Sequence, residues 1–109
     1  MAITHTVLFQ FKDTSPEDLK AMCERFASLK EGCRHPSTGR EYIQSVKGGR
    51  DNSPEGLQEG LTHAFVLEFA SVEHRDWYVK LDPVHAAFMK SIEGVVERAV
   101  VVDFVEGVY

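Results

Sequence analysis

His85 offers the clearest chemistry in this sequence, because it lies where a helix is expected to begin. The preceding Asp82-Pro83 is a helix-start signal: an aspartate side chain can cap free backbone N–H groups, and proline is tolerated at the first helical position. His85 would then lie near the positive end of the helix dipole, where protonation of an imidazole is disfavoured. A neutral His85 that can accept a proton is therefore expected at pH 7, with the phenol of Tyr78 one to two turns upstream.

Two further histidines lie on segments with alternating hydrophobicity. His5 and His63 occupy equivalent places in residues 3–11 and 61–70, each on the side that carries the large apolar residues. The first and third strands are the two central neighbours in the order expected below, so both imidazoles are predicted to lie close together and to share an interior with His85. Such a group is typical of a small-molecule site. For each strand histidine alone, a hydrogen-bonded place in the core is the alternative.

A metal site is another interpretation of the same three histidines, since neutral imidazoles suit zinc, copper or iron. No HxH or HxxxH spacing holds two of them on one element, so no bound metal is expected. The walls of a pocket would come from aromatic residues that are equally suited to a plain core: Phe26, Phe65, Trp77 and Phe88. His35 and His74 are expected to be solvated. Neither a phosphate-binding glycine loop nor a serine nucleophile motif is present.

The elements that position these residues can be read from periodicity and capping signals. Strands are predicted at residues 3–11, 42–46, 61–70 and 99–105. Helices are predicted from Ser15-Pro16 to Gly32, from Ser71 to about Val79, and from Asp82 to about Ile92. Residues 48–56 are expected to form only a loop, and residues 47–59 are a candidate lid. The order β-α-β-β-α-β predicts an α+β protein with a ferredoxin-like sheet.

One face of this sheet lacks any helix to cover it. The helices would cover the face with His5 and His63, whereas the opposite face still holds apolar side chains, namely Leu8, Val66, Val100, Val102 and Phe104. Leaving them in water would forfeit several kcal/mol at about 25 cal/mol per Å² of apolar surface. A second copy packed sheet to sheet would bury them, so a symmetric homodimer is predicted.

Composition excludes several classes of function. The 109 residues suit a single domain, residues 1–109, and the net charge of −5 without a basic run argues against nucleic-acid binding. The N-terminus has no signal-peptide pattern and no apolar run is long enough for a membrane span, so a cytoplasmic protein is expected. Of the two cysteines, Cys23 is predicted to be buried in a helix stripe and Cys33 to be an exposed thiol, with no disulfide framework.

Three segments together resemble the stress-responsive A/B barrel (Dabb) family: residues 4–12 (THTVLFQFK), residues 60–69 (GLTHAFVLEF) and residues 82–88 (DPVHAAF). The loop Asn52-Ser53-Pro54-Glu55 that leads to Gly60 is similar to the middle loop of that family. The likeness spans nearly the whole chain in the right order. It implies a dimeric α+β barrel, in agreement with the argument from the uncovered face.

The family includes the plant olivetolic acid cyclase, a cofactor-free enzyme that closes a linear polyketide thioester by intramolecular aldol condensation. The resemblance implies that His85 is a catalytic base and that Tyr78 matches the catalytic tyrosine, with His5 and His63 at the places of that enzyme's strand histidines. The stretch from Tyr78 to His85 is one residue longer than in the cyclase. The extra residue is either absorbed in the turn at Lys80-Leu81 or rotates Tyr78 away from the pocket.

Three hypotheses of function follow. In the first, His85 removes a proton from a carbon flanked by carbonyl groups and Tyr78 orients it or donates a hydrogen bond to the enolate; the carbonyls acidify the carbon, so no cofactor is needed. The ligand would be a small hydrophobic or polyketide-like molecule. In the second, the protein is a non-catalytic stress-associated homodimer with a packed core or a lipophilic-ligand pocket. A haem-degrading or quinone-forming monooxygenase is the third, on analogy of fold alone.

Overall fold

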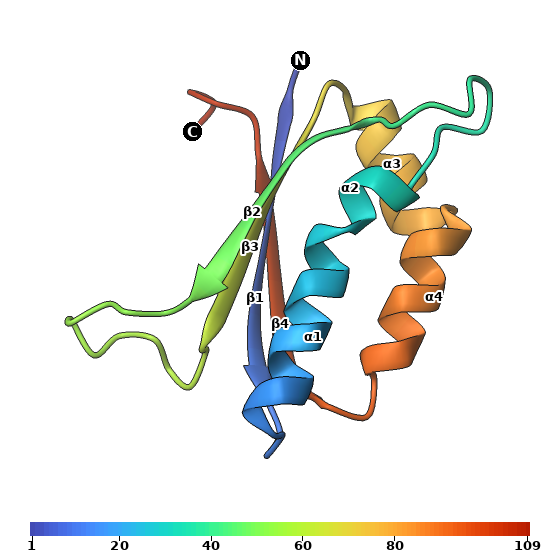
Figure 1. The fold of residues 1–109 in the computed structure, drawn as a ribbon. Helices are drawn as coiled ribbons and strands as arrows, with labels where there is room; N and C mark the ends of the chain where they lie inside the picture. Colours follow the sequence, from blue (N-terminus) through green and yellow to red (C-terminus); the bar gives the residue numbers. More distant parts are fainter.

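The computed structural model describes residues 1–109, and Figure 1 shows its helices on one face of a four-stranded sheet. The strands are β1 (Ile3–Phe11), β2 (Ile43–Arg50), β3 (His63–Phe69) and β4 (Val96–Phe104). The helices are α1 (Pro16–Ala27), α2 (Leu29–Gly32), α3 (Val72–Lys80) and α4 (Pro83–Ile92). The order of elements confirms the predicted α+β class.

The sheet has the strand order β2-β3-β1-β4, and all neighbouring strands are antiparallel. This is the predicted ferredoxin-like arrangement, with β1 and β3 in the centre. Because neighbours run in opposite directions, the start of β1 lies beside the ends of both β3 and β4. Ile3 accordingly pairs with Phe69, and His5 pairs with Asp103.

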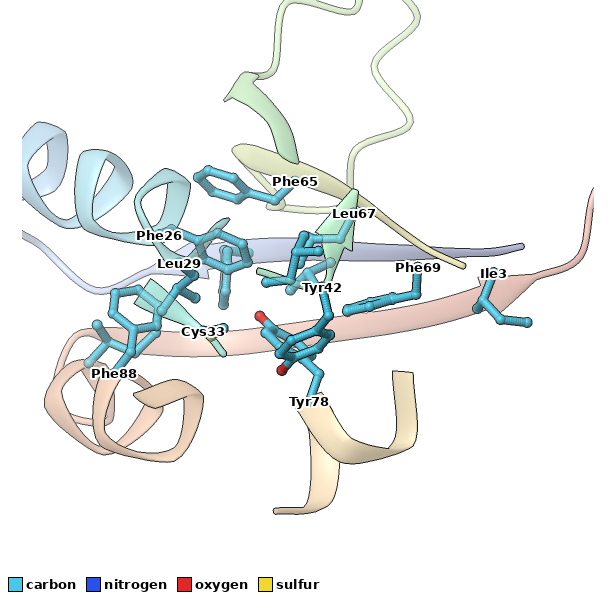
Figure 2. Close-up of a cluster of buried hydrophobic side chains, with 14 of the residues drawn as sticks. Ile3, Phe26, Leu29, Cys33, Tyr42, Phe65, Leu67, Phe69, Tyr78 and Phe88 are labelled. Atoms are coloured by element: carbon cyan, nitrogen blue, oxygen red, sulfur yellow. The ribbon is translucent and has the colours of Figure 1, made fainter. Parts of the chain in front are cut away.

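The core fills the space between the sheet and the helices. Figure 2 shows aromatic side chains converging there from both layers. Phe26 of α1 stacks on Phe65 of β3 with ring centroids 4.1 Å apart, and Phe88 of α4 meets the Phe26 ring edge-on at 5.5 Å. Burial of these large side chains is the main force that attaches the helices to the sheet.

The predicted helix starts are confirmed by their capping geometry. A side-chain oxygen of each capping residue accepts a hydrogen bond from a backbone N–H of the first turn, at Ser15 (3.2 Å), Ser71 (3.1 Å) and Asp82 (2.9 Å). The first helix, however, does not run unbroken to Gly32. It ends at Ser28, whose hydroxyl donates to the Arg25 carbonyl (2.8 Å), and α2 follows as a separate turn.

Strand β2 is longer than its sequence suggests. We expected residues 48–56 to form only a loop, yet Gly48, Gly49 and Arg50 continue the strand and pair with β3. The reason lies in the partner strand: the ring of Phe65 covers Gly48, and a Cβ there would lie 2.2 Å from that ring. An aromatic residue opposite a glycine of an edge strand supplies the contacts that the glycine lacks.

Three expectations about polar side chains were wrong. Cys33 is fully buried and not an exposed thiol, because the chain turns inward after α2. Cys23 is only half-buried. His35 and His74 are half-buried as well, with ring centroids 5.0 Å apart and both close to Tyr42. The loop after α2 folds back against the start of α3, and this shields both imidazoles from water.

No helix covers the opposite face of the sheet (Figure 1), and a group of apolar side chains lies on it. Val102 is 57 % exposed and Phe104 is 45 % exposed there, beside Leu8, Val66 and Val100. The sequence-based expectation of an uncovered apolar face is therefore confirmed. No helix has the length and apolar character needed to span a membrane.

Candidate active site

Tyr78 and His85 meet where α3 ends and α4 begins. Tyr78 is in the last turn of α3, and His85 is in the first turn of α4. Their rings stack with centroids 3.9 Å apart and an angle of 30° between the planes. Leu81 is the C-cap of α3, and the extra residue is accommodated in the turn that it forms before α4. Tyr78 therefore faces the interior, with 1 % of its surface exposed. The extra residue before His85 therefore does not rotate Tyr78 outward.

The protonation states of the pair suit proton transfer. Burial lowers the pKa of His85 most; the Tyr78 backbone and the Asp82 carboxylate raise it, and His5 lowers it further, with a net effect below the ordinary value. Burial also raises the pKa of Tyr78, and nearby Cys33 and Asp82 add to this rise. At neutral pH His85 is thus an uncharged imidazole that can accept a proton, and the Tyr78 hydroxyl stays protonated.

Asp82 fixes the start of α4 and therefore the place of His85. Its carboxylate is 1 % exposed: Oδ1 accepts the Val84 N–H at 2.9 Å, and Oδ2 accepts the Tyr42 hydroxyl at 2.5 Å. These two hydrogen bonds offset the cost of removing the carboxylate from water. The cap was predicted from Asp82-Pro83. Tyr42 was missed, because a partner 40 residues away leaves no local signal.

His5 lies against the Tyr78 ring, edge to face, with centroids 5.8 Å apart. Its Nδ1 is 2.6 Å from Oδ1 of Asp103, and Oδ2 of Asp103 accepts a hydrogen bond from Arg75 Nη1 at 2.8 Å. A carboxylate at Nδ1 favours the tautomer that carries its hydrogen there and leaves Nε2 free to accept. Asp103 and Arg75 were missed. The signal for Asp103 was a single carboxylate within the otherwise apolar residues 99–105.

His63 does not join this group. It pairs with Phe9, four residues beyond His5 on β1, which corresponds to about 13 Å along the strand. The prediction that the strand histidines lie close together was wrong, because equivalent places on antiparallel neighbours fall at opposite ends of the sheet. The three-histidine metal site loses a ligand for the same reason. No group of three or more His, Cys, Asp or Glu side chains has an arrangement that could hold a metal ion.

The predicted aromatic walls are part of the packed interior. Phe26, Phe65 and Phe88 belong to the buried core, and half-buried Trp77 donates its indole N–H to the Arg34 carbonyl at 3.2 Å. Hollows of about 530, 420 and 310 Å³ open elsewhere on the molecule, and none of them is lined by His5, Tyr78 or His85. The loop between β2 and β3, which we considered as a lid, projects from the sheet on the side away from α3 and α4 (Figure 1).

These contacts define a buried acid–base group of His85, Tyr78 and His5. It contains a neutral imidazole at a helix start, a protonated phenol stacked on it, and a second imidazole held by a carboxylate. Such a set can accept a proton from an acidic carbon and donate a hydrogen bond to the oxygen that gains charge. Only His85 retains appreciable contact with solvent, because Tyr78 and His5 are buried.

Comparison with known proteins places the chain in a family. The profile described as Stress responsive A/B Barrel Domain matches residues 3–106. Among curated proteins, the stress-response A/B barrel domain-containing protein HS1 of Arabidopsis thaliana is 29% identical over 103 residues, which cover 94% of this chain and 87% of HS1.

Solved structures share the fold at lower identity. A hydroxynitrile lyase from Passiflora edulis superposes with a TM-score of 0.83 at 20% identity, covering 99% of this chain and 96% of the lyase. A dimeric ferredoxin-like protein of unknown function from Thermobifida fusca has a TM-score of 0.71 at 23% identity and covers 95% of this chain and 90% of that protein. At these identities the two structures show a common fold and nothing more.

Proposed function

This chain belongs to the stress-responsive A/B barrel domain family, and from that premise we propose that it is a small cofactor-independent enzyme of the lyase or aldol-cyclase type. Its substrate would be a small hydrophobic or polyketide-like molecule with an acidic position next to a carbonyl or nitrile group. The observation that carries the proposal is the stacked pair of Tyr78 and His85, with a neutral imidazole against a protonated phenol.

In this proposal His85 removes the proton and Tyr78 stabilises the resulting anion. His85 takes a proton from a carbon flanked by carbonyl groups, or from the hydroxyl of a cyanohydrin. In the second case the C–CN bond breaks as the carbonyl forms, and the cyanide leaves with the proton returned by His85 as hydrogen cyanide. The Tyr78 hydroxyl donates a hydrogen bond to the oxygen that gains negative charge. A positioned general base of this kind contributes about 10²–10⁴-fold to the rate.

The remaining candidate residues would hold the substrate. His5, oriented by Asp103, would accept a hydrogen bond from a hydroxyl or enol group of the substrate at its free Nε2. We retain His63, Phe26, Phe65, Trp77 and Phe88 as candidate substrate contacts. Since Tyr78 and His5 are buried beneath His85, substrate binding in this proposal requires the start of α4 to move outward. The Asp82 cap and the Tyr42 hydrogen bond are the contacts that would have to adjust.

Turnover by site variants tests the proposal. The purified protein is assayed with a linear polyketone thioester and with mandelonitrile, because a hydroxynitrile lyase shares the fold. We expect His85→Ala to reduce the rate about 10²–10⁴-fold and Tyr78→Phe to reduce it as well. His35→Ala is the matched control, since that half-buried imidazole lies outside the acid–base group. An unchanged rate in His85→Ala, with the fold intact by circular dichroism, contradicts the proposal.

A second candidate function is a non-catalytic stress-response or lipophilic-ligand-binding dimer. The filled interior favours it: the aromatic side chains pack together, and none of the three hollows described above is lined by Tyr78 or His85. The two candidates differ in one measurement. The non-catalytic protein would bind apolar probes without turning over either substrate, and His85→Ala would leave that binding unchanged.

We also propose a homodimer and a cytoplasmic location. The uncovered apolar face of the sheet would pack against the same face of a second copy, and the protein from Thermobifida fusca with this fold is described as dimeric. Both cysteines are free, which suits a reducing compartment. Residues 1–109 would act as one A/B barrel domain, with no nucleic-acid partner.

A further inference from the structure

A groove runs between helix α1 and the edge strand β2, at a distance from the acid–base group. We call it the α1–β2 groove; its volume is about 420 Å³, and its walls are formed by Pro16, Leu19, Lys20, Cys23, Glu24, Ala27, Gly48, Gly49, Arg50, His63 and Phe65. Pockets that bind small molecules typically measure about 300–1,000 Å³. The groove therefore has the size of a ligand site.

The groove has an apolar base with space above it. Leu19, Cys23 and Ala27 line it from α1, and the buried ring of Phe65 lines it from β3. Phe65 stacks on Phe26, which is visible in Figure 2, so this part of the wall is closely packed. An alkyl chain could lie against this wall and cover its exposed apolar atoms.

One cationic side chain of the groove has no partner. Arg50 is exposed and takes part in none of the ion pairs of the molecule, whereas Lys20 lies 3.9 Å from Glu24. His63 lies beside Arg50; burial lowers the pKa of His63, and the charge of Arg50 lowers it further, so His63 adds no charge at neutral pH. The uncompensated charge in the groove is therefore the Arg50 guanidinium, whose planar fork suits a carboxylate.

We propose that the α1–β2 groove binds a medium-chain monocarboxylate, with its alkyl chain on Leu19, Cys23 and Phe65 and its carboxylate on Arg50. This site is separate from the acid–base group. His63, at the groove, pairs with Phe9, while His5 is four residues earlier on β1, about 13 Å away. None of His5, Tyr78 and His85 lines the groove, so a failure of carboxylate binding there leaves the acid–base group intact.

Cys23 provides a built-in reporter for occupancy. It lines the groove and is half-buried, whereas Cys33 is fully buried. Iodoacetamide should therefore alkylate Cys23 first in the folded full-length protein, which mass spectrometry can verify. We expect decanoate, below its micelle concentration, to slow this alkylation at least fivefold at saturation. Decanol at the same concentration should protect less than twofold, because it lacks the charge that Arg50 would bind.

A charge variant separates specific binding from apolar adsorption. Arg50→Gln should abolish the protection by decanoate, and Arg40→Gln, which removes an exposed arginine outside the groove, should retain it. Equal protection by decanol, or full protection in Arg50→Gln, would overturn the proposal. So would protection by decyl phosphate without protection by decanoate. None of these readouts depends on catalytic turnover, so their failure leaves the acid–base proposal untouched.

Discussion

At the scale of single residues, two features of the surroundings of His85 set its protonation state. Its ring is stacked on Tyr78 and partly removed from water, and its backbone belongs to the first turn of a helix. Both conditions disfavour a positive charge. His85 therefore stays neutral without any carboxylate bound to its ring, while His5 keeps its tautomer through Asp103. The two imidazoles are prepared for proton transfer by different physical means.

The titration of His85 should reflect this environment. We expect its pKa to lie below the ordinary value of about 6.5, because burial penalises the imidazolium. The unfolded chain then binds more protons than the folded chain, so the His85 contribution to the free energy of unfolding is fully retained above about pH 6.5 and is lost as the pH falls through the lowered pKa. Burial of His63 acts with the same sign.

NMR detection of the imidazole nitrogens, with His85→Gln to assign the signal, measures this pKa directly. Urea unfolding of the wild type and of His85→Gln between about pH 7.5 and about pH 5, a range that includes the ordinary histidine value of about 6.5, measures the linked change in stability. The variant should lose part of the pH dependence. A His85 midpoint at or above the ordinary value would contradict the assignment of a neutral base.

Sequence reasoning identified part of this chemistry. The Asp82 cap and the place of His85 could be predicted, because capping signals act between neighbours along the chain. The contacts of His5 could not be read in this way, since alternation along a strand tells which side a residue takes but not which residue lies opposite. The directions of the strands decide which residues lie opposite each other. Because neighbouring strands are antiparallel, His63 lies at the far end of the sheet from His5, and Asp103 lies beside His5.

At the scale of elements, β2 shows how one strand depends on its neighbour. The pair Gly48-Gly49 indicates a loop by local preference, because glycine loses more backbone freedom than any other residue on folding. The structure nevertheless makes it strand, since the ring of Phe65 covers Gly48 and the backbone pairs with β3. The break at Ser28 is the opposite case, in which a local hydrogen bond interrupts a continuous helical pattern.

The two glycines should respond differently to the same change. Gly48→Ala places a methyl group 2.2 Å from the Phe65 ring, so we expect a loss of about 1–3 kcal/mol in the free energy of unfolding. Gly49→Ala meets no atom within 4 Å and serves as the matched control, with an expected change within about 0.5 kcal/mol. Urea denaturation measures both. Equal losses in the two variants would show that Phe65 does not constrain position 48.

At the scale of the whole molecule, the two faces of the sheet have different roles. One face holds the core and the acid–base group, and the other presents Val102 and Phe104 to solvent. The sequence predicted this division, because the count of helical segments left nothing to cover the second face. A second copy is the covering that we propose.

A charge on the uncovered face should prevent the proposed dimer. In a symmetric interface each substitution occurs twice, so Val102→Glu places two carboxylates in one apolar contact. We expect light scattering to report a dimer for the wild type at micromolar concentration and a monomer for this variant. Val79→Glu, at a 45 % exposed position on α3, is the control and should remain dimeric. A monomeric wild type would contradict the model of two packed sheets.

The central place of β1 also has a consequence for the order in which the chain can fold. Thr4 pairs with Phe104, so β1, which is made before the other strands of this domain, has β4, which is made after them, as one neighbour. Contacts between such distant segments form slowly, because a long loop must close before any of them can form. Until β4 docks, β1 is an edge and His5 has no carboxylate beside it. The contact between His5 and Asp103 therefore forms only after β4 has been made and has docked on β1.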